Sequence, residues 1–438
     1  MNQKKILFGA LLLALGGAAQ AQNAAVERLI QFAASRPQLE NARAIGTLCF
    51  AGNRLSARLQ DDCNNLVGNA FGANPATDTA VRRALAAITG DNVTIPIDRS
   101  GLGRSGRLPK PLGTRSGAGY AAWMEADESM VSLNLAEDEG LGSDWSMFVN
   151  LSLSNSERDR SGNEDGFDED GNALTAGFNL RTSDTTLVGA AVVYGERQMD
   201  YSNNSGSLDT ADLTINLFAG WQGGNGFYVD SLLSLTRRDH DQVRRIAYGL
   251  GPAAVDQQFD SSFDATERLL ALTGGFQVYR GASTFDPYLR VELVDAASDG
   301  YAEVSRNPLA NGGGWALEVD ALDENFTRGI LGFRWSHAIS SSNGVWMPFI
   351  DISWINVSGV DADAARVRYA GDRSNVVNAS RLDFFMQADE EDTSYGSAAL
   401  GLSAQWANGW SGFASYRQNF SEDLYRQREY NLGVRAEF

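Results

Sequence analysis

The sequence predicts an all-β transmembrane barrel of 12 antiparallel strands, preceded by a small helical region that a disulfide holds together. Three observations support this fold class. From residue 144 onwards, apolar and polar residues alternate with period two. The connections between these stretches alternate between short and long, and the last strand is apolar on one face and polar on the other. A strand between lipid and a polar lumen has this pattern.

Composition narrows the possible functions. The 438-residue chain has a formal net charge of −19, which argues against nucleic acid or an anionic surface as a partner. No stretch after residue 21 reaches the roughly 18 apolar residues of a spanning helix, so a membrane protein with this sequence has to be a barrel. A soluble secreted protein is the competing interpretation.

The amino terminus predicts export. Lys4 and Lys5 precede the apolar run 6–15, and small residues at Ala19 and Ala21 fit a signal-peptidase site. Ten apolar residues are too few to cross a bilayer as a helix, so we expect residues 1–21 to be a cleaved signal peptide. The expected location of the mature chain is the outer membrane.

Residues 22–100 are expected to form a small helical region. Their apolar residues recur at helical spacing in three stretches, with Asn53 and Asp78 as expected N-caps and Gly90 as the end of the last helix. The periodic residues are Val26, Leu29, Ile30, Ala33, Leu55, Leu59, Cys63, Leu66, Val81, Leu85 and Ile88.

The only two cysteines, Cys49 and Cys63, are predicted to form a disulfide between two of these helices, because exported proteins fold in an oxidising compartment. Closing a loop of about 15 residues would stabilise the region by roughly 3 kcal/mol in the chain-entropy model. A metal site is not expected, since His240 and His337 lie far away in the sequence.

The remaining chain divides in two. Residues 101–143, rich in glycine and proline, are predicted to be a linker or a threaded lumenal segment. Residues 144–438 are predicted to be the barrel. Its 12 strands are expected to start near residues 144, 172, 185, 208, 226, 264, 285, 322, 345, 393, 410 and 425.

The connections between strands are sorted by length, which fits a membrane barrel and not a soluble sandwich. The short ones are 181–184, 222–226, 280–284, 340–344 and 407–409. The long polar ones are 157–171, 199–207, 241–263, 297–320 and 357–392. Aromatic residues flank the short turns, as expected for rings at the level of the lipid headgroups: Trp221, Phe227, Tyr279, Phe285, Trp335, Trp346, Trp406 and Trp410.

Charged residues on the strands are predicted to face the lumen, because a charge at the centre of the lipid face costs roughly 2–4 kcal/mol. Such residues could hold a segment in the pore, set an ion preference or simply pair with one another. The predicted lumen-facing residues are Asp230, Arg290, Glu292, Arg328, Arg334, Asp351, Arg435 and Glu437.

The end of the chain carries a resemblance. In the last strand, a polar residue, a glycine and two hydrophobic positions fall at Asn431, Gly433, Ala436 and Phe438. Together with the signal peptide, the amino-terminal region, the connecting segment and the 12 strands, this ending resembles the β-barrel translocator domain of the autotransporter family of Gram-negative bacteria. The resemblance covers about residues 120–438.

The resemblance implies that those four residues are an assembly signal for the barrel-assembly machinery, with periplasmic chaperones as further partners. It also implies that a segment lies in the lumen just before the first strand, and that residues 22–100 are translocated or displayed. This amino-terminal region departs from the family, because it is too short for a repetitive β-helix. Residues 101–143 contain no Asn-Asn pair, where some relatives cut themselves, so autoproteolysis is not expected.

No catalytic, cofactor-binding or metal-binding residue is predicted. The glycine pattern at 101–106 follows no predicted strand, so a dinucleotide site is not expected. The acidic run 159–170 lacks the glycine register of a calcium loop and is expected to be a solvated loop. A barrel lipase would need a serine beside a histidine, and neither His240 nor His337 has one two residues away on its strand face.

Three functions are therefore compared. Translocation or display of residues 22–100 is preferred. The alternative is a passive pore or structural barrel whose helical region stays periplasmic or plugs the lumen, and an outer-membrane lipase is less favoured. The barrel is expected to be monomeric, with membrane lipid around it.

Overall fold

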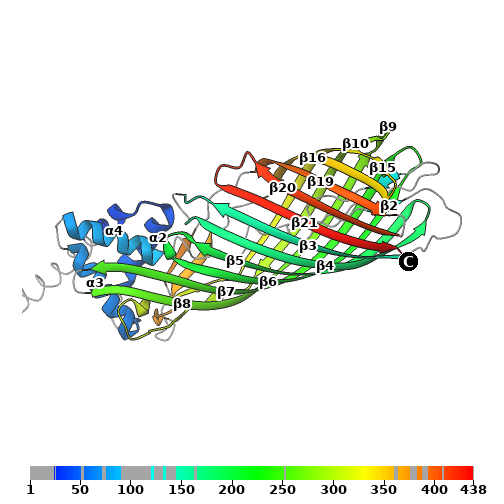
Figure 1. The fold of residues 1–438 in the computed structure, drawn as a ribbon. Coiled ribbons are helices and arrows are strands. Elements are labelled where there is room, and N and C mark those ends of the chain that lie inside the picture. Colours follow the sequence, from blue (N-terminus) through cyan, green and yellow to red (C-terminus); the bar gives the residue numbers. More distant parts are fainter. Residues whose placement is uncertain are drawn as a thin grey trace, which may run out of the picture.

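Twelve long antiparallel strands form a closed barrel in the computed structural model (Figure 1). The ring closes where β21 (Tyr425–Glu437) pairs with β3 (Trp145–Arg158), so the last strand binds the first. The other barrel strands are β4 (Phe167–Ser183), β5 (Thr186–Tyr201), β6 (Gly206–Gln222), β7 (Phe227–Leu250), β8 (Ala253–Phe276), β10 (Ser283–Ser298), β14 (Leu322–His337), β16 (Gly344–Ser358), β19 (Ser394–Trp406) and β20 (Trp410–Phe420).

The expected signal peptide 1–21, Asn53, Gly90 and the glycine pattern at 101–106 lie outside the described residues. Two short paired strands, β1 (Tyr120–Ala122) and β2 (Ser132–Asn134), are the described part of the 101–143 segment. The structure describes residues 24, 26–50, 54–71, 75–89, 120–122, 132–134, 145–161, 165–250, 253–359, 364–374, 382–386, 393–406 and 409–437.

Side chains on the barrel strands point alternately outwards and inwards, as the period-two pattern predicts. On β3, Trp145 and Met147 are exposed, whereas Ser146 and Phe148 are buried. The outer face carries an apolar belt, and a soluble monomer rarely exposes so large an apolar surface. The belt includes Leu151, Leu174, Val192, Ile215, Leu233, Leu272, Val291, Leu331, Ile352, Leu400 and Leu432, which are 39% to 66% exposed.

The two rims of the barrel differ. All five short turns lie at one rim, which we call the turn end, as predicted. Here β9 (Val278–Arg280) and β15 (Ile339–Ser341) extend two hairpins. The longer connections lie at the opposite rim, the loop end, and include the 3-10 helix η3 (Ser202–Asn204). The short turns of the sequence therefore mark one rim, whereas the loop end has connections of both kinds, since only residues 251–252 join β7 to β8 and 421–424 join β20 to β21.

The prediction of a polar connection over 241–263 is wrong. Strands β7 and β8 continue through this stretch as one paired hairpin that extends beyond the belt. The inner face of the hairpin is buried and mixes apolar residues such as Phe259 with polar ones such as Gln242 and Arg244. Its outer face carries charges such as Arg245 and Asp256 that pair in water. Because of those charges, the composition of this paired stretch resembles that of a loop, which misled the prediction. For the same reason the starts expected near 172 and 264 are late, since β4 and β8 begin at Phe167 and Ala253.

The predicted connections 297–320 and 357–392 also contain strands. They form a four-stranded sheet in the order β11 (Tyr301–Ala302), β13 (Leu317–Val319), β17 (Ala365–Tyr369) and β18 (Asp383–Met386). The 3-10 helix η4 (Gly313–Trp315) precedes β13, and β12 (Val304–Ser305) pairs with β8. Each of these strands is too short to show a periodic pattern of its own.

Three helices, α2 (Arg36–Leu48), α3 (Ala57–Phe71) and α4 (Pro75–Thr89), follow a helical segment at 26–32. The predicted disulfide is confirmed: it joins Cys49, at the end of α2, to Cys63 in α3. The prediction of Asp78 as an N-cap is wrong. Asp78 lies in the first turn of a helix that begins earlier, and its carboxylate pairs with Arg28. A carboxylate in a first helical turn is favourable there as well.

The helices lie against the loop end, beside the extended β7–β8 hairpin (Figure 1). One buried apolar cluster joins them to this end of the barrel, including Leu29, Leu59 and Leu85 from the helices and Ile246, Phe259, Trp315 and Tyr369 from the strands and loops. We call the described residues 26–89 the cap. Among the described residues, no helix is long and apolar enough to cross a membrane.

Candidate functional site: the lumen and the capped loop end

The lumen is lined by polar side chains, and seven of the eight residues predicted to face it are at most 6% exposed on inward positions. These are Asp230, Arg290, Glu292, Arg328, Arg334, Asp351 and Arg435. The side chain of Glu437 lies outside the described part of the chain. Six of the seven come from β7, β10, β14 and β16, which together with β8 form one continuous part of the wall, so these charges gather on one side.

Ion pairs connect most of this charged wall. Glu292 lies between Arg290, at 2.7 Å, and Arg328, at 2.8 Å. Arg334 pairs with Asp351 at 3.1 Å, and the hydroxyl of Tyr288 donates to the same carboxylate. Buried charges need partners of this kind, because an unpaired charge away from water is costly. The wall therefore carries two ion-paired groups, which we call the ionic lattice.

The opposite wall of the lumen carries many small polar residues among a few charged ones, such as Glu169, Arg417 and Arg435. Strands β3, β4, β19, β20 and β21 present Ser146, Asn150, Thr175, Asn179, Ser397, Ser403, Ser411, Ser415 and Asn431 inwards. A chain in the lumen would find hydrogen-bonding groups on one side and charges on the other, so its backbone could be satisfied without water.

Aromatic rings lie over inward-facing glycines inside the barrel. In each pair, the glycine is the cross-strand partner of the ring residue, and an added Cβ would overlap the ring. We call these six pairs the aromatic–glycine joints: Phe148–Gly177, Phe218–Gly189, Tyr228–Gly275, Tyr288–Gly332, Phe349–Gly401 and Phe413–Gly433. All lie within a few residues of the turn end of their strands.

The closing strand holds three described residues of the predicted assembly signal. Asn431 and Gly433 face inwards, and Gly433 lies under the ring of Phe413. Ala436 is buried and pairs with Met147 and Trp410 on the neighbouring strands. Phe438 lies outside the described residues.

At the loop end, a carboxylate fixes the cap to the barrel. Asp62 of α3 is 3% exposed, and it accepts hydrogen bonds from the backbone N–H groups of Gly312 at 2.8 Å and Gly314 at 2.9 Å. Gly312 has a left-handed backbone (φ 84°), which lets successive N–H groups converge on an anion. Arg58 donates to the same carboxylate, and this hydrogen bond raises the pKa of Arg58.

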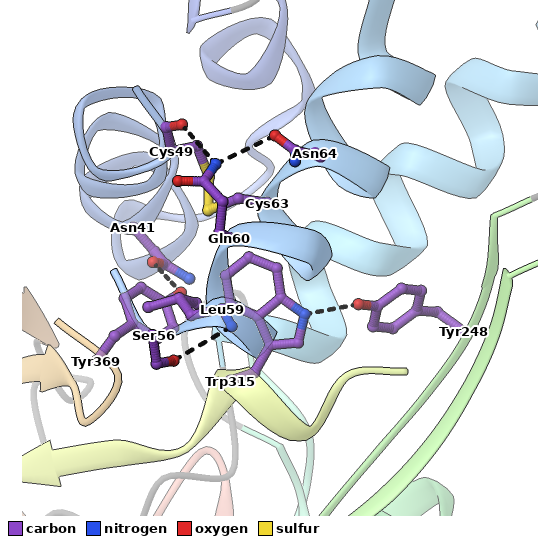
Figure 2. Close-up of a disulfide and its surroundings, with 10 residues drawn as sticks. All are labelled: Asn41, Cys49, Ser56, Leu59, Gln60, Cys63, Asn64, Tyr248, Trp315 and Tyr369. Atoms are coloured by element: carbon purple, nitrogen blue, oxygen red, sulfur yellow. Dashed lines mark hydrogen bonds between the residues drawn. A yellow bond between two sulfur atoms is a disulfide. The ribbon is translucent and has the colours of Figure 1, made fainter. Parts of the chain in front are cut away.

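Aromatic side chains of the barrel reach the cap as well (Figure 2). Tyr369 donates its hydroxyl to Asn41 of α2 at 2.7 Å, and burial raises the pKa of that hydroxyl, so it stays protonated. Trp315 is fully buried and donates from its indole nitrogen to Tyr248 at 2.8 Å. Figure 2 places both rings beside Leu59 and below the disulfide. The cap therefore packs on aromatic side chains of the loop end.

Backbone pairing adds a third set of contacts. Leu55 and Asp372 form an isolated antiparallel bridge. Ser56 donates its N–H to the carbonyl of Gly371 at 2.8 Å, and Arg373 donates to the carbonyl of Arg54 at 2.7 Å. We call the residues that receive the cap, 312–315 and 369–373, the seat. The seat was not predicted, because it lies in stretches that the sequence indicates to be loops. Their apolar residues, Trp315 and Tyr369, were the available signal.

The histidines do not form a recognisable hydrolase site. His240 is buried with its Nδ1 beside the Thr210 hydroxyl at 2.9 Å. Strand register brings Ser283 to 2.8 Å from Nδ1 of His337, a cross-strand contact that a same-strand search does not find. Among the described residues, no carboxylate is hydrogen-bonded to His337 to orient it for catalysis. Nor do the described residues include a cluster suited to a metal ion.

Comparison with known proteins identifies the barrel. A family model described as the autotransporter beta-domain matches residues 147–417. The translocator domain of the autotransporter NalP from Neisseria meningitidis is similar in structure, with 19% identity, a TM-score of 0.49, and 68% of this chain and 90% of that chain covered. No curated protein gives a significant match.

Two further solved structures are similar. The beta domain of the Bordetella autotransporter Brka has 16% identity and a TM-score of 0.47, with 68% of this chain and 100% of that chain covered. The transport unit of the autotransporter AIDA-I from Escherichia coli has 10% identity and a TM-score of 0.40, with 69% and 93% covered.

Proposed function

This chain belongs to the autotransporter beta-domain family, and we propose that its barrel inserts in the outer membrane, exports the helical amino-terminal region and keeps it at the cell surface as the cap. The cell surface then corresponds to the loop end and the periplasm to the turn end. This assignment agrees with the usual placement of short turns on the periplasmic side of such barrels.

The observation that carries the proposal is that the end of α4 and the start of β3 lie at opposite rims of the barrel. Helix α4 ends at Thr89 in the cap, whereas β3 begins at Trp145 at the turn end. Residues 90–144 connect them and have to cross the membrane layer. Fully extended, they could span roughly 180 Å, several times the length of about 46 Å expected for β3. The chain is long enough for this crossing.

The lumen is the favourable path for that crossing. An unpaired backbone in lipid leaves polar groups unsatisfied, which costs several kcal/mol for each group. The charged wall and the opposite wall, which is rich in small polar residues, offer partners instead. Within the connecting chain, the stretch 99–115 has five basic residues and no carboxylate, which suits a lumen that contains carboxylates such as Asp230 and Asp286. The five are Arg99, Arg104, Arg107, Lys110 and Arg115. We therefore place the connecting segment inside the barrel in the proposed mechanism.

Selective amine labelling of intact cells tests the proposal. Lys110 is the only lysine after residue 21, so in a Lys110→Arg parent an introduced lysine is the only ε-amine. Its labelling is scored on its own peptide by mass spectrometry, apart from that of the α-amino group. Adding Arg43→Lys places one lysine on the exposed side of α2, where Arg43 is 56% exposed. A membrane-impermeant amine reagent should label this variant in intact cells.

The matched control is Arg280→Lys in the same parent, an equally conservative change at an exposed turn-end position. It should become labelled only after the outer membrane is opened. Labelling of Arg280→Lys and protection of Arg43→Lys in intact cells would instead support the alternative, a barrel whose helical region stays periplasmic. A plugged pore predicts protection of Arg43→Lys and an increase in bilayer conductance when residues 22–110 are deleted.

A further inference from the structure

The contacts between cap and barrel exist on one side of the membrane only. All residues of the seat lie in loop-end connections, beyond the apolar belt. A cap on the turn-end side would have no access to them. The seat is therefore a binding surface whose ligand, a segment of the same chain, can reach it only after crossing.

The fit between cap and seat is close. An added Cβ at Gly314 would lie 2.5 Å from Cα of Leu59, and one at Gly371 would lie 3.0 Å from its Cβ. Leu59 and Leu55 are 0% and 7% exposed in the docked cap. Side chains of α3 thus meet backbone directly, without room for a larger residue at either glycine.

The chemistry of the seat also depends on docking. The Asp62 carboxylate is almost fully buried, and its partners include two backbone N–H groups that belong to the barrel. Without the seat, this carboxylate and the backbone groups of residues 54–56 would turn to water. A ligand that binds only one of two states shifts the equilibrium towards that state.

We propose that the seat captures the cap as it emerges and thereby makes its export one-way. This inference rests on the proposed function. Docking at the loop end would prevent the exported cap from moving back through the barrel. The groups that bind the cap are the N–H groups of Gly312 and Gly314, the hydroxyl of Tyr369 and the backbone of Gly371.

Two seat variants test the proposal in the full-length protein that carries Arg43→Lys and Lys110→Arg. Asp62→Asn keeps the shape and removes the charge that the N–H groups bind. Gly314→Leu blocks the approach of α3. Matched controls are Asp61→Asn, at a neighbouring carboxylate that is 64% exposed, and Gly249→Leu, where nothing lies within 4 Å of an added Cβ.

The measurement is the fraction of inserted barrels whose cap is labelled from outside soon after synthesis, with insertion scored by heat-modifiable migration on gels. Losing charge-assisted hydrogen bonds should lower the ratio of docked to undocked cap about tenfold or more. We expect a matching fall in early outside labelling for both variants and wild-type values for both controls.

If both variants are exported at the wild-type rate and their caps merely become sensitive to trypsin, the seat stabilises the cap after export and the proposal is wrong. Scoring only inserted barrels separates a folding failure of Gly314→Leu from a failure of export, and the near-isosteric Asp62→Asn provides the second test. If the parent with Arg43→Lys is itself protected from outside labelling, the proposed function fails instead.

Discussion

At the scale of single residues, glycines without a side chain leave room for aromatic rings on the inner wall of the barrel. Each aromatic–glycine joint places a ring in the space that a side chain on the neighbouring strand would fill. The ring covers the exposed backbone of the glycine, which otherwise weakens a strand. At the Tyr288–Gly332 joint the same ring delivers a hydroxyl to Asp351, so packing and the ionic lattice are coupled.

Replacing Gly332 by valine should therefore destabilise the barrel. The new side chain would displace the ring of Tyr288 and weaken its hydrogen bond to Asp351, with an expected loss of about 1–3 kcal/mol from overpacking. The measurement is the free energy of unfolding in urea, in detergent or lipid. Gly329→Val on the same strand is the control, since the nearest atom to its added Cβ is 4.0 Å away. Equal effects at both positions would contradict the role of the joint.

The ionic lattice makes a second prediction. Glu292 is fully buried between Arg290 and Arg328, so Glu292→Gln removes the charge that compensates both. Breaking a buried pair from one side costs roughly 3–5 kcal/mol. We expect a lower midpoint for the heat-induced gel shift. The comparison is Glu157→Gln in an exposed pair, where less than about 1 kcal/mol is at stake. A stable Glu292→Gln barrel would show that the lattice contributes little.

At the scale of elements, the sequence predicted strands well where lipid dictates their pattern. Within the belt, one face has to be apolar and the other polar, so period two is unmistakable. Beyond the belt, both faces of the β7–β8 hairpin can carry polar residues, and the charges of Arg245 and Asp256 concealed a strand. The period-two pattern is weaker beyond the belt, and the predicted starts of β4 and β8 were wrong there.

The cap was predictable in its helices and disulfide, which depend on local spacing, but its seat was not. The contact between Leu59 and Gly314 joins residues far apart in the sequence and leaves no periodic trace. Asp62 likewise gave no signal, since a carboxylate in an amphipathic helix usually faces water. Its partners, the backbone N–H groups of Gly312 and Gly314, are brought to it only by the three-dimensional path of the loop.

The disulfide should stabilise the cap and not the barrel. Cys49 and Cys63 close a short loop within the cap core, and their removal as a Cys49→Ser/Cys63→Ser pair should cost the cap roughly 3 kcal/mol. Trypsin should then cleave the cap of the purified protein faster, while heat-modifiable migration of the barrel stays as in the parent. A cap with unchanged resistance, or a barrel that no longer shifts on gels, would contradict this division.

At the scale of the whole molecule, the fold class could be predicted because every barrel strand needs an apolar outer face and a polar inner face. The outer face carries the apolar belt, a surface suited to lipid, while many polar side chains face the lumen. This alternation of apolar and polar residues repeats in the strands from β3 to β21, so the prediction did not depend on any single residue. The cap departs from this alternation: it is an ordinary globular core resting on a membrane barrel.

An arginine on the belt should therefore act differently from one beyond it. Leu217, on the outer face of β6, is 50% exposed, and Leu217→Arg should cost about 2–4 kcal/mol if lipid surrounds it. Gln198→Arg adds the same charge on the outer face of β5, above the belt, and should be nearly neutral. Refolding yield into lipid vesicles, compared between the two, is the measurement. Equal yields would argue against a lipid-covered belt.

The aromatic–glycine joints also single out one line along the wall. Near the turn end, neighbouring strands are fastened either by a covalent turn or by a joint, and the two kinds alternate around the described barrel. Only the boundary between β21 and β3 has neither. At the turn end, backbone hydrogen bonds hold the cylinder shut there, and the side-chain contacts across this boundary, such as Ser152 to Glu429 and Arg426 to Glu157, lie farther along the strands. When the wall is strained, this is where it should unzip first, turning a closed tube into a curved sheet with two free edges.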